Sequence, residues 1–470
     1  QEGWTPPWDR TGSPRGDGRA GNPPHPGDPS PRADSDRGLD DEEASSEPSL
    51  EPESADLREA ICSLYEDDKK QARVEASKQI IEEIDPATHR ESGHLLWWDE
   101  EDHIYTRGGE KVVETRLLEL LGKHFSNHEA QEIIGRIKPQ TYRSEFGVER
   151  FVPVANGDLK ITEDGGDLKK PAPERGFRNR SEAGWHPDAD APRFRDFFLS
   201  VVPREVDRKT LQEYVGYALM HWGLPYHKAL FIVGPQASGK STFLAVVCYV
   251  LGKTTRLSPQ QLVEGRFGAA ELEDSWANVS SDIPTALLSN VGRFKEITAG
   301  DQIHVERKFE QGYTIQPTTK HLYSANQLPE IKIDDDAFFR RVLIIPFPRT
   351  VPKEERIRSL ADKLKQEADG ILRWAAEGLM RLLRNGEFTG DLSPSETRRL
   401  WEEHASSIGR FKVRCLKVTG RDGDAVAKED LYSAYAEFCM EKGLAAESQQ
   451  KLTRVLKRDP KIRDADRTPP

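Results

Sequence analysis

The residues whose types and spacing point most clearly to chemistry form one short run, Gly234-Pro235-Gln236-Ala237-Ser238-Gly239-Lys240-Ser241, which is followed by Thr242. Its glycines allow backbone N–H groups to curl around phosphate oxygens. The Lys240 ammonium would reach the β and γ phosphates of ATP, and the Ser241 hydroxyl would bind Mg2+. The run therefore predicts a site for ATP and Mg2+. The alternative reading is a glycine-rich turn without a ligand.

A site of this kind also needs an acidic side chain at the end of a neighbouring strand to hold magnesium and position water. Asp282 ends the moderately apolar run 276–281, so it is the candidate magnesium ligand beside Ser241. No second acid follows it, and the general base therefore stays open. Three further acids precede the run, and each could equally be a solvated surface residue: Glu271, Glu273 and Asp274.

Two later segments supply polar groups that a phosphate site could use. Asn326 ends the strand-like run 319–325 and could orient the attacking water, or it could be a turn residue before Leu328-Pro329. Arg340 and Arg341 precede a buried-type apolar run. Either guanidinium could cross a subunit boundary to a neighbour's γ phosphate, which is worth several orders of magnitude in rate where it occurs. Ion pairs with the preceding aspartates are the alternative.

The elements that must position these groups are strands alternating with helices. The apolar run 229–233 leads directly into the glycine-rich run, and residues 242–251 continue as a helix. This strand, loop and helix order is the one that a phosphate-binding loop requires. Alternation continues to about Pro348 and predicts an α/β fold with a parallel sheet covered by helices.

The rest of the chain divides by composition and periodicity. Ala55–Ile84 reads as one charged amphipathic helix ended by Pro86, an Asn156-Gly157 turn predicts a hairpin within 151–161, and 193–221 reads as helices. We expect six regions: 1–60, a disordered acidic leader rich in Pro and Gly; 61–150, a small mixed or helical region; 151–225, a small helical domain; 226–350, the core; 351–405, a helical connector; and 406–466, a winged helix-turn-helix.

Composition limits the remaining possibilities. Residues 1–60 hold fifteen acidic and six basic residues, so this segment supplies −9 of the formal net charge of −12 over 470 residues. Such a segment cannot offset its ordering entropy by burial. The four cysteines lie far apart, which suggests neither a zinc site nor disulfides. No apolar run is long enough to cross a membrane, so we expect a cytoplasmic protein. The chain begins at Gln1 rather than Met, which suggests either a processed product or an incomplete one that could lack an upstream domain.

The ordered blocks from the glycine-rich run through Phe294–Pro329 and Asp335–Phe347 resemble superfamily 3 helicases of the phage and plasmid primase-helicase type, also seen in poxviruses. The resemblance covers roughly residues 151–348. It implies an AAA+ core that forms a hexameric ring, hydrolyses ATP between subunits and draws one DNA strand through its pore, in a prokaryotic host or a virus-infected cell. Duplex DNA would be unwound at the fork.

The same resemblance assigns roles residue by residue. The family's phosphate-loop residues fall on Gly234, Gly239, Lys240 and Ser241, and its Walker B acid falls on Asp282, where many relatives have Glu or an acidic pair. Its sensor asparagine falls on Asn326, and its arginine finger falls on Arg340 or Arg341. Its pore hairpin follows Thr298–Asp301, which implies that Arg307 and Lys308 lie against DNA phosphates. Taken alone, that basic pair would more often be a solvated turn.

Three hypotheses follow from these observations. The first is an ATP-dependent replicative DNA helicase. The second is a P-loop ATPase that remodels or packages DNA without unwinding it, and the third is a DNA-binding initiator that holds nucleotide without hydrolysing it. Residues 62–150 are too few for most primase domains and show no Asp-x-Asp strand, so we predict no priming activity. A primase domain or subunit is an expected partner instead.

Overall fold

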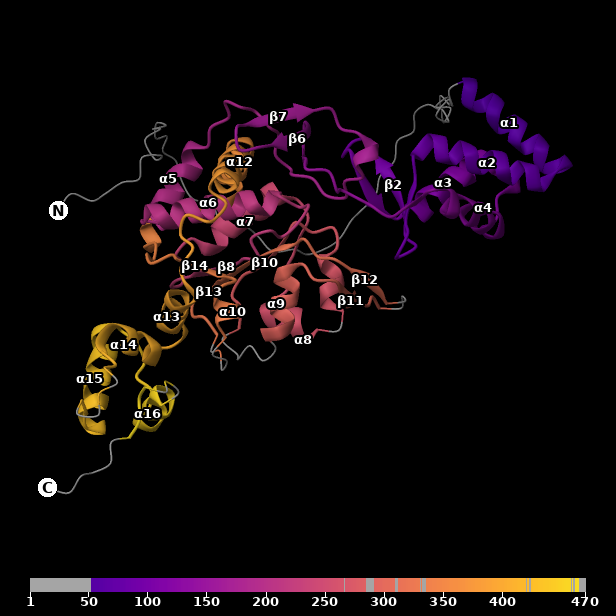
Figure 1. The fold of residues 1–470 in the computed structure, drawn as a ribbon. Coiled ribbons are helices and arrows are strands. Elements are labelled where there is room, and N and C mark those ends of the chain that lie inside the picture. The colour runs from indigo at the N-terminus through magenta and orange to yellow at the C-terminus, as the bar shows by residue number, and fades with distance from the viewer. Residues whose placement is uncertain are drawn as a thin grey trace, which may run out of the picture.

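The computed structural model describes residues 52–265, 267–284, 291–308, 312–329, 331, 335–419, 421, 424–457, 459 and 461–464. The predicted leader, residues 1–60, lies outside these ranges except for its last nine residues, which begin the first helix. The described chain has a central α/β part, with an N-terminal module at one end and a group of C-terminal helices at the other (Figure 1).

The N-terminal module, residues 52–143, combines four helices with a small sheet in the order β3-β2-β1-β4. Its elements are α1 (Pro52–Asp67), α2 (Lys69–Ile84), β1 (Ala87–His89), β2 (Leu95–Asp99), β3 (Ile104–Arg107), α3 (Gly109–Leu121), α4 (Asn127–Gln140) and β4 (Tyr142–Arg143). The prediction of a single helix over 55–84 is wrong. Asp68 has extended backbone angles and its carboxylate accepts hydrogen bonds from the Lys70 and Gln71 amides, so it ends α1 and caps α2.

A three-stranded antiparallel sheet and two helices connect this module to the core. They are β5 (Val152–Val154), β6 (Gly157–Ile161), β7 (Gly166–Lys169), α5 (Pro192–Val201) and α6 (Glu205–Leu219). β5 and β6 pair across the Asn156-Gly157 turn, which confirms the predicted hairpin. The two helices confirm the helical prediction for 193–221. Short 3₁₀ helices occur at η2 (Gly122–His124), η3 (Pro173–Arg175), η4 (Gly268–Leu272) and η5 (Lys353–Glu355).

The core is a five-stranded, fully parallel sheet in the order β14-β8-β13-β10-β9, as the alternating pattern predicted. Its strands are β8 (Ala229–Val233), β9 (Thr254–Thr255), β10 (Ala277–Ser280), β13 (Lys320–Ala325) and β14 (Val342–Pro346). The associated elements are α7 (Lys240–Leu251), α8 (Pro259–Glu264), α9 (Val291–Ala299), the hairpin β11 (Ile303–Val305) and β12 (Tyr313–Ile315), α10 (Asp336–Phe339), α11 (Leu360–Lys365) and α12 (Ala368–Asn385).

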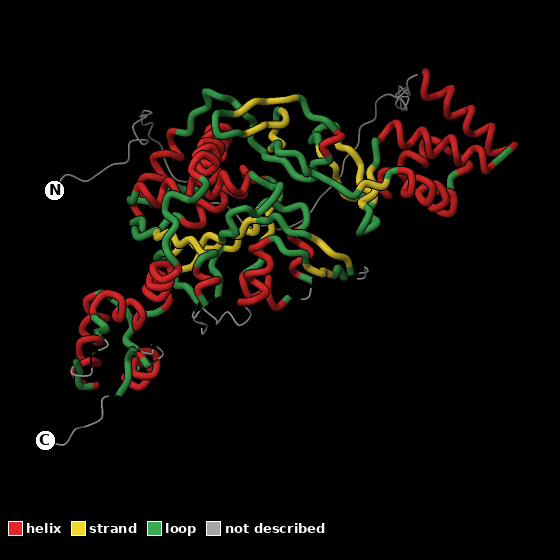
Figure 2. The backbone as a smooth tube through the Cα atoms, in the orientation of Figure 1, coloured by secondary structure: helices red, strands yellow, loops and turns green. Residues whose placement is uncertain are grey.

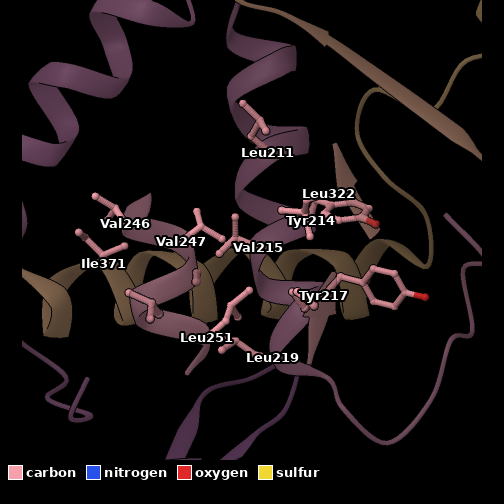
Figure 3. Packing of buried hydrophobic residues seen from close by; sticks show 14 of the residues in the cluster. Leu211, Tyr214, Val215, Tyr217, Leu219, Val246, Val247, Leu251, Leu322 and Ile371 are labelled. Atoms are coloured by element: carbon pink, nitrogen blue, oxygen red, sulfur yellow. The ribbon is translucent and has the colours of Figure 1, made fainter. Parts of the chain in front are cut away.

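Successive residues of a strand point to opposite sides of the sheet. Both faces of this sheet are buried. Leu230 and Ile232 of β8 join the cluster formed with α6, α7 and α12. Phe231 and Val233 join a second cluster with α9, α10 and the first C-terminal helix. Figure 2 shows helices on both sides of the strands, and Figure 3 shows part of the first cluster, in which Val215 of α6 lies beside Val247 of α7.

The C-terminal group contains α13 (Pro394–Ala405), α14 (Ser407–Cys415), α15 (Lys428–Glu441) and α16 (Gln449–Leu456). Residues 407–415, within the predicted winged unit, form helix α14. Within the described part of 406–466 there is no β-strand, so the helices are present but the wing of the winged helix-turn-helix is not seen. Over the described ranges, no helix is both long and apolar enough to span a membrane.

Candidate nucleotide-binding site

The glycine-rich loop lies at the carboxyl end of β8 and leads into α7. A Cβ atom on Gly234 would lie 2.1 Å from the Phe347 carbonyl oxygen, so no larger residue fits there without movement. Gly239 has a φ of 91°, and a Cβ atom on it would lie 2.8 Å from Val201 of α5. Both glycines therefore serve the close approach of backbone to its neighbours, and α5 supports the loop from behind.

Lys240 points back into the loop. Its Nζ donates to the carbonyl oxygens of Gly234 at 2.7 Å and Pro235 at 2.8 Å, and to Asn326 Oδ1 at 3.1 Å. The side chain is buried, and burial lowers the pKa of Lys240 while the charge of Asp282 acts in the opposite direction. The ammonium is thus already at the centre of the loop, held by neutral oxygens that phosphate oxygens could replace.

A cavity of about 270 Å³ opens beside this lysine. It is lined by Gln236, Ala237, Ser238, Gly239, Lys240, Ser241, Thr242, Asp282 and Asn326. These residues come from the carboxyl ends of three adjacent parallel strands, β8, β10 and β13, and such ends meet at one edge of the sheet. The structure therefore brings the loop, the predicted acid and the predicted asparagine together.

The oxygen donors around the cavity fit a magnesium ion. The Ser241 and Asp282 side chains are both in exposed residues that line it. Asp282 has a φ of 54°, a left-handed conformation that Asp adopts more readily than most residues. Among the described residues no cluster of His, Cys, Asp or Glu could hold a metal by itself. Mg2+ is commonly held by one or two protein oxygens together with substrate phosphates, which agrees with this sparse donor set.

Glu273 and Asp274 lie away from the cavity, because they precede the first residue of β10 whereas the cavity is at the carboxyl end of this strand. Their side chains are only 6% and 11% exposed, and both form ion pairs with Arg107 and Arg178. Neither is an alternative magnesium ligand at this site. The other reading, a solvated surface acid, is also wrong for both. The arginines that pair with these acids are far away in the sequence, so the neighbouring residues did not indicate the ion pairs.

Arg340 and Arg341 lie at the edge of the sheet opposite to the cavity. Val342 pairs with Ala229 and Pro346 pairs with Val233, so the arginines stand where β8 begins. At ~3.3 Å per residue, the length of β8 places them more than about 13 Å from the loop of the same chain. Neither side chain lines the cavity.

The two arginines differ in their surroundings. Arg340 is exposed, and its guanidinium forms no hydrogen bond or ion pair with any described residue. Arg341 is half-buried and donates from Nη1 to the Ala337 carbonyl at 2.8 Å. The described aspartates before them pair elsewhere, Asp335 with Lys295 and Asp336 with Arg398.

The predicted hairpin is present, with His304 opposite Thr314 in its ladder. Arg307 does not project from it freely. Its guanidinium donates to the Tyr313 hydroxyl at 2.8 Å, the Ala270 carbonyl at 3.0 Å and Glu273 at 3.1 Å. Lys308 is exposed. In this conformation Arg307 is held by the protein, and contact with DNA would require these bonds to open.

The parallel sheet, the loop at its carboxyl edge and the groups around the loop agree with a P-loop core in a mixed α/β protein. The chain is a distant homologue of a protein of Acanthamoeba polyphaga mimivirus that carries the provisional name of helicase, with 26% identity over 180 residues. This match covers 37% of the chain and 17% of that relative, so the chain spans a minor part of its length.

Two further comparisons describe similarity without assigning a role. Residues 232–341 match a family of unknown function, DUF5906. Two apo structures of the C-terminal region of NrS-1 align with a TM-score of 0.47 and 10% identity, over 80% of this chain and 84% and 83% of those chains.

Proposed function

We propose that this chain is the ATP-driven motor of a DNA helicase of superfamily 3. The observation that carries the proposal is the cavity in which Lys240, Asp282 and Asn326 converge from three strands. Homology to a viral protein provisionally named a helicase supports the choice of DNA as the track.

Each group at the cavity has a separate task. The loop amides and Lys240 bind and neutralise the phosphates of ATP. Ser241 and Asp282 would hold Mg2+, which when bound draws charge from the transferring phosphoryl group. Asn326, whose Oδ1 already accepts a hydrogen bond from Lys240, orients the attacking water.

Hydrolysis then needs a second positive group beside Lys240, and no arginine lines the cavity. Arg340 is exposed at the opposite edge of the same sheet, so it serves a neighbouring subunit rather than its own. A ring in which each subunit presents Arg340 to the next satisfies every site, and an AAA+ hexamer is the arrangement we propose. The hairpin β11–β12 is the element that we propose contacts the translocating strand.

The deciding experiment is the ATPase rate with and without single-stranded DNA. Lys240→Ala should lower hydrolysis at least about 100-fold, since it removes a charge aimed at the reacting phosphates. Lys111→Ala, an exposed lysine of the N-terminal module, is the matched control and should behave as the native chain. Equal rates for native chain and Lys240→Ala would refute the proposal.

The two other hypotheses are separated by further outcomes of the same assay. DNA-stimulated hydrolysis without displacement of an annealed strand would indicate an ATPase that remodels or packages DNA. ATP binding without turnover, with or without DNA, would indicate a nucleotide-binding initiator, which the single acid at Asp282 would suit.

A further inference from the structure

Four segments that lie far apart in the chain meet around one buried carboxylate. We call this group the arginine junction, and it consists of Arg107, Arg178, Glu273, Asp274, Arg307 and Tyr313. Arg107 ends β3 of the N-terminal module, and Arg307 and Tyr313 belong to the β11–β12 hairpin. Glu273 and Asp274 stand between η4 and β10 of the core.

Glu273 is at the centre of the junction. Its Oε2 accepts hydrogen bonds from Tyr313 OH at 2.6 Å, Arg107 Nη2 at 2.9 Å and Arg307 Nη2 at 3.1 Å. Its Oε1 lies 3.3 Å from Arg178 Nη1. One oxygen atom thus joins the N-terminal module to both arms of the hairpin at its turn end, and Arg307 further ties the hairpin to the Ala270 carbonyl.

Asp274 supports the same connection. Its Oδ2 accepts from Arg107 Nη2 at 3.0 Å, and its Oδ1 lies 2.8 Å from Arg178 Nε. Three guanidinium groups therefore face two carboxylates. Burial alone would raise the pKa of Glu273, but Arg178, the Tyr313 hydroxyl and Arg107 outweigh it and lower that pKa to about 2. Glu273 is ionised at neutral pH.

The loop that carries Glu273 leads, through one short strand, to the nucleotide site. The Thr319 hydroxyl, just before β13, lies 2.9 Å from both the Leu272 and the Ser275 carbonyl oxygens and shares its one proton between them, which holds the loop that carries Glu273. β10 follows that loop directly and leads to Asp282 at the cavity. Glu273, which binds the hairpin, and Asp282, the proposed magnesium ligand, therefore lie at opposite ends of one short buried strand.

We propose that Glu273 is a positioning residue that holds the β11–β12 hairpin against the N-terminal module and so determines how strongly DNA at the hairpin stimulates ATP hydrolysis. The second half of this inference rests on the proposed function, whereas the first half does not. Loss of the Glu273 charge leaves three partly buried guanidiniums without their shared partner, which weakens every contact that crosses the junction.

Two variants separate positioning from folding. Glu273→Gln keeps the shape of the side chain but removes its charge. Arg107→Ala cuts only the link to the N-terminal module, since Arg178 and Arg307 still reach Glu273, and its side chain is 37% exposed. Arg116→Ala is the matched control, because this arginine belongs to the same module and pairs at the surface with Glu83 and Glu119.

The first measurement is amide hydrogen exchange of the full chain without DNA. Glu273→Gln should exchange at least about threefold faster than the native chain in peptides covering 303–305 and 313–315, with a smaller effect in Arg107→Ala and none in Arg116→Ala. Peptides from β8 and β13 should be unchanged. Hairpin exchange equal to native, or equal acceleration of β8 and β13, would overturn the inference.

The second measurement is ATPase rate against single-stranded DNA concentration. Basal hydrolysis should stay within about twofold of native, while the DNA concentration for half-maximal stimulation should rise at least about threefold in Glu273→Gln, and Arg107→Lys should recover part of the Arg107→Ala loss. An equal fall in basal and stimulated rates would contradict positioning. A native chain without DNA stimulation would refute the helicase proposal and leave the exchange result to decide the positioning.

Discussion

At the scale of single residues, the charged groups of this protein are set by what they are buried against. The Lys240 ammonium donates hydrogen bonds to neutral carbonyl oxygens and to the Asn326 amide oxygen. In the proposed function, a negatively charged phosphate would replace these neutral acceptors. The Glu273 carboxylate pairs with guanidinium groups and accepts a hydrogen bond from the Tyr313 hydroxyl. In the proposed function Lys240 directs its charge to a ligand, whereas Glu273 directs its charge to the protein, although both side chains are almost inaccessible to solvent.

His321 of β13 leads to a prediction on pH. It is fully buried, its Nε2 has no hydrogen-bond partner among the described residues, and burial together with the adjacent Lys320 charge lowers its pKa from 6.5 to about 3. The unfolded chain takes up this proton near pH 6.5 and the folded chain does not, so stability is present above pH 6.5 and is lost as pH falls toward 3, by ~1.4 kcal/mol per unit.

Thermal unfolding at pH 7 and pH 5 checks this point. The native Tm should fall on acidification, and His321→Gln should show a smaller fall than the native chain. His128→Gln, at an exposed histidine of α4, should retain the native dependence. A pH dependence unaltered by His321→Gln would mean that other groups account for it.

At the scale of elements, the close contact between α6 and α12 holds the helical layer over the sheet. Gly216 of α6 faces α12 so closely that a Cβ atom would lie 2.4 Å from the Ala375 carbonyl oxygen and 2.5 Å from the Leu379 nitrogen. Gly378 of α12 makes the reciprocal approach, with its Cβ position 2.2 Å from the Gln212 carbonyl oxygen. The glycines allow the two backbones to touch.

Gly216→Ala should therefore separate these helices and destabilise the protein by roughly 1–3 kcal/mol, since backbone atoms cannot give way as a flexible side chain can. Gly135→Ala is the matched control, because Gly135 lies in helix α4 with nothing within 4 Å of its Cβ position. There the change should be neutral or stabilising by ~0.5–1 kcal/mol. Chemical denaturation of both variants measures the difference, and equal effects would contradict the packing argument.

At the scale of the whole molecule, the arginines and the cavity stand at opposite edges of one sheet, so the proposed enzyme is complete only as an assembly. Arg340→Ala should retain ATP binding but lose hydrolysis by about 10³-fold or more. Mixed with Lys240→Ala, which has the arginine but no competent loop, it should regain activity beyond the sum of the two separate preparations.

The control for this mixing experiment is the double variant Lys240→Ala with Arg340→Ala. It lacks the arginine and should not rescue Arg340→Ala. Rescue by the double variant, or no rescue by Lys240→Ala, would exclude Arg340 as the group supplied by a neighbour.

The sequence by itself determined the local parts of this protein. The apolar run 229–233, the glycine-rich run and the helix after it predicted the strand, loop and helix that the structure contains, because backbone preferences and periodicity depend on adjacent residues. The parallel order of strands then made it possible to name Asp282 and Asn326 as partners of Lys240. The missed break at Asp68 depended on two hydrogen bonds that its carboxylate accepts from backbone amides, which compete with helix continuation.

Only the tertiary structure decided the contacts between distant segments. Arg107 and Glu273 are 166 positions apart, and nothing in either neighbourhood indicates that the two meet. The same holds for Arg307, for which the family resemblance implied contact with DNA and whose guanidinium donates to Glu273 in the fold. Such ion pairs form because packing of whole elements removes charges from water together, and a charge run in a sequence does not reveal which surfaces will pack.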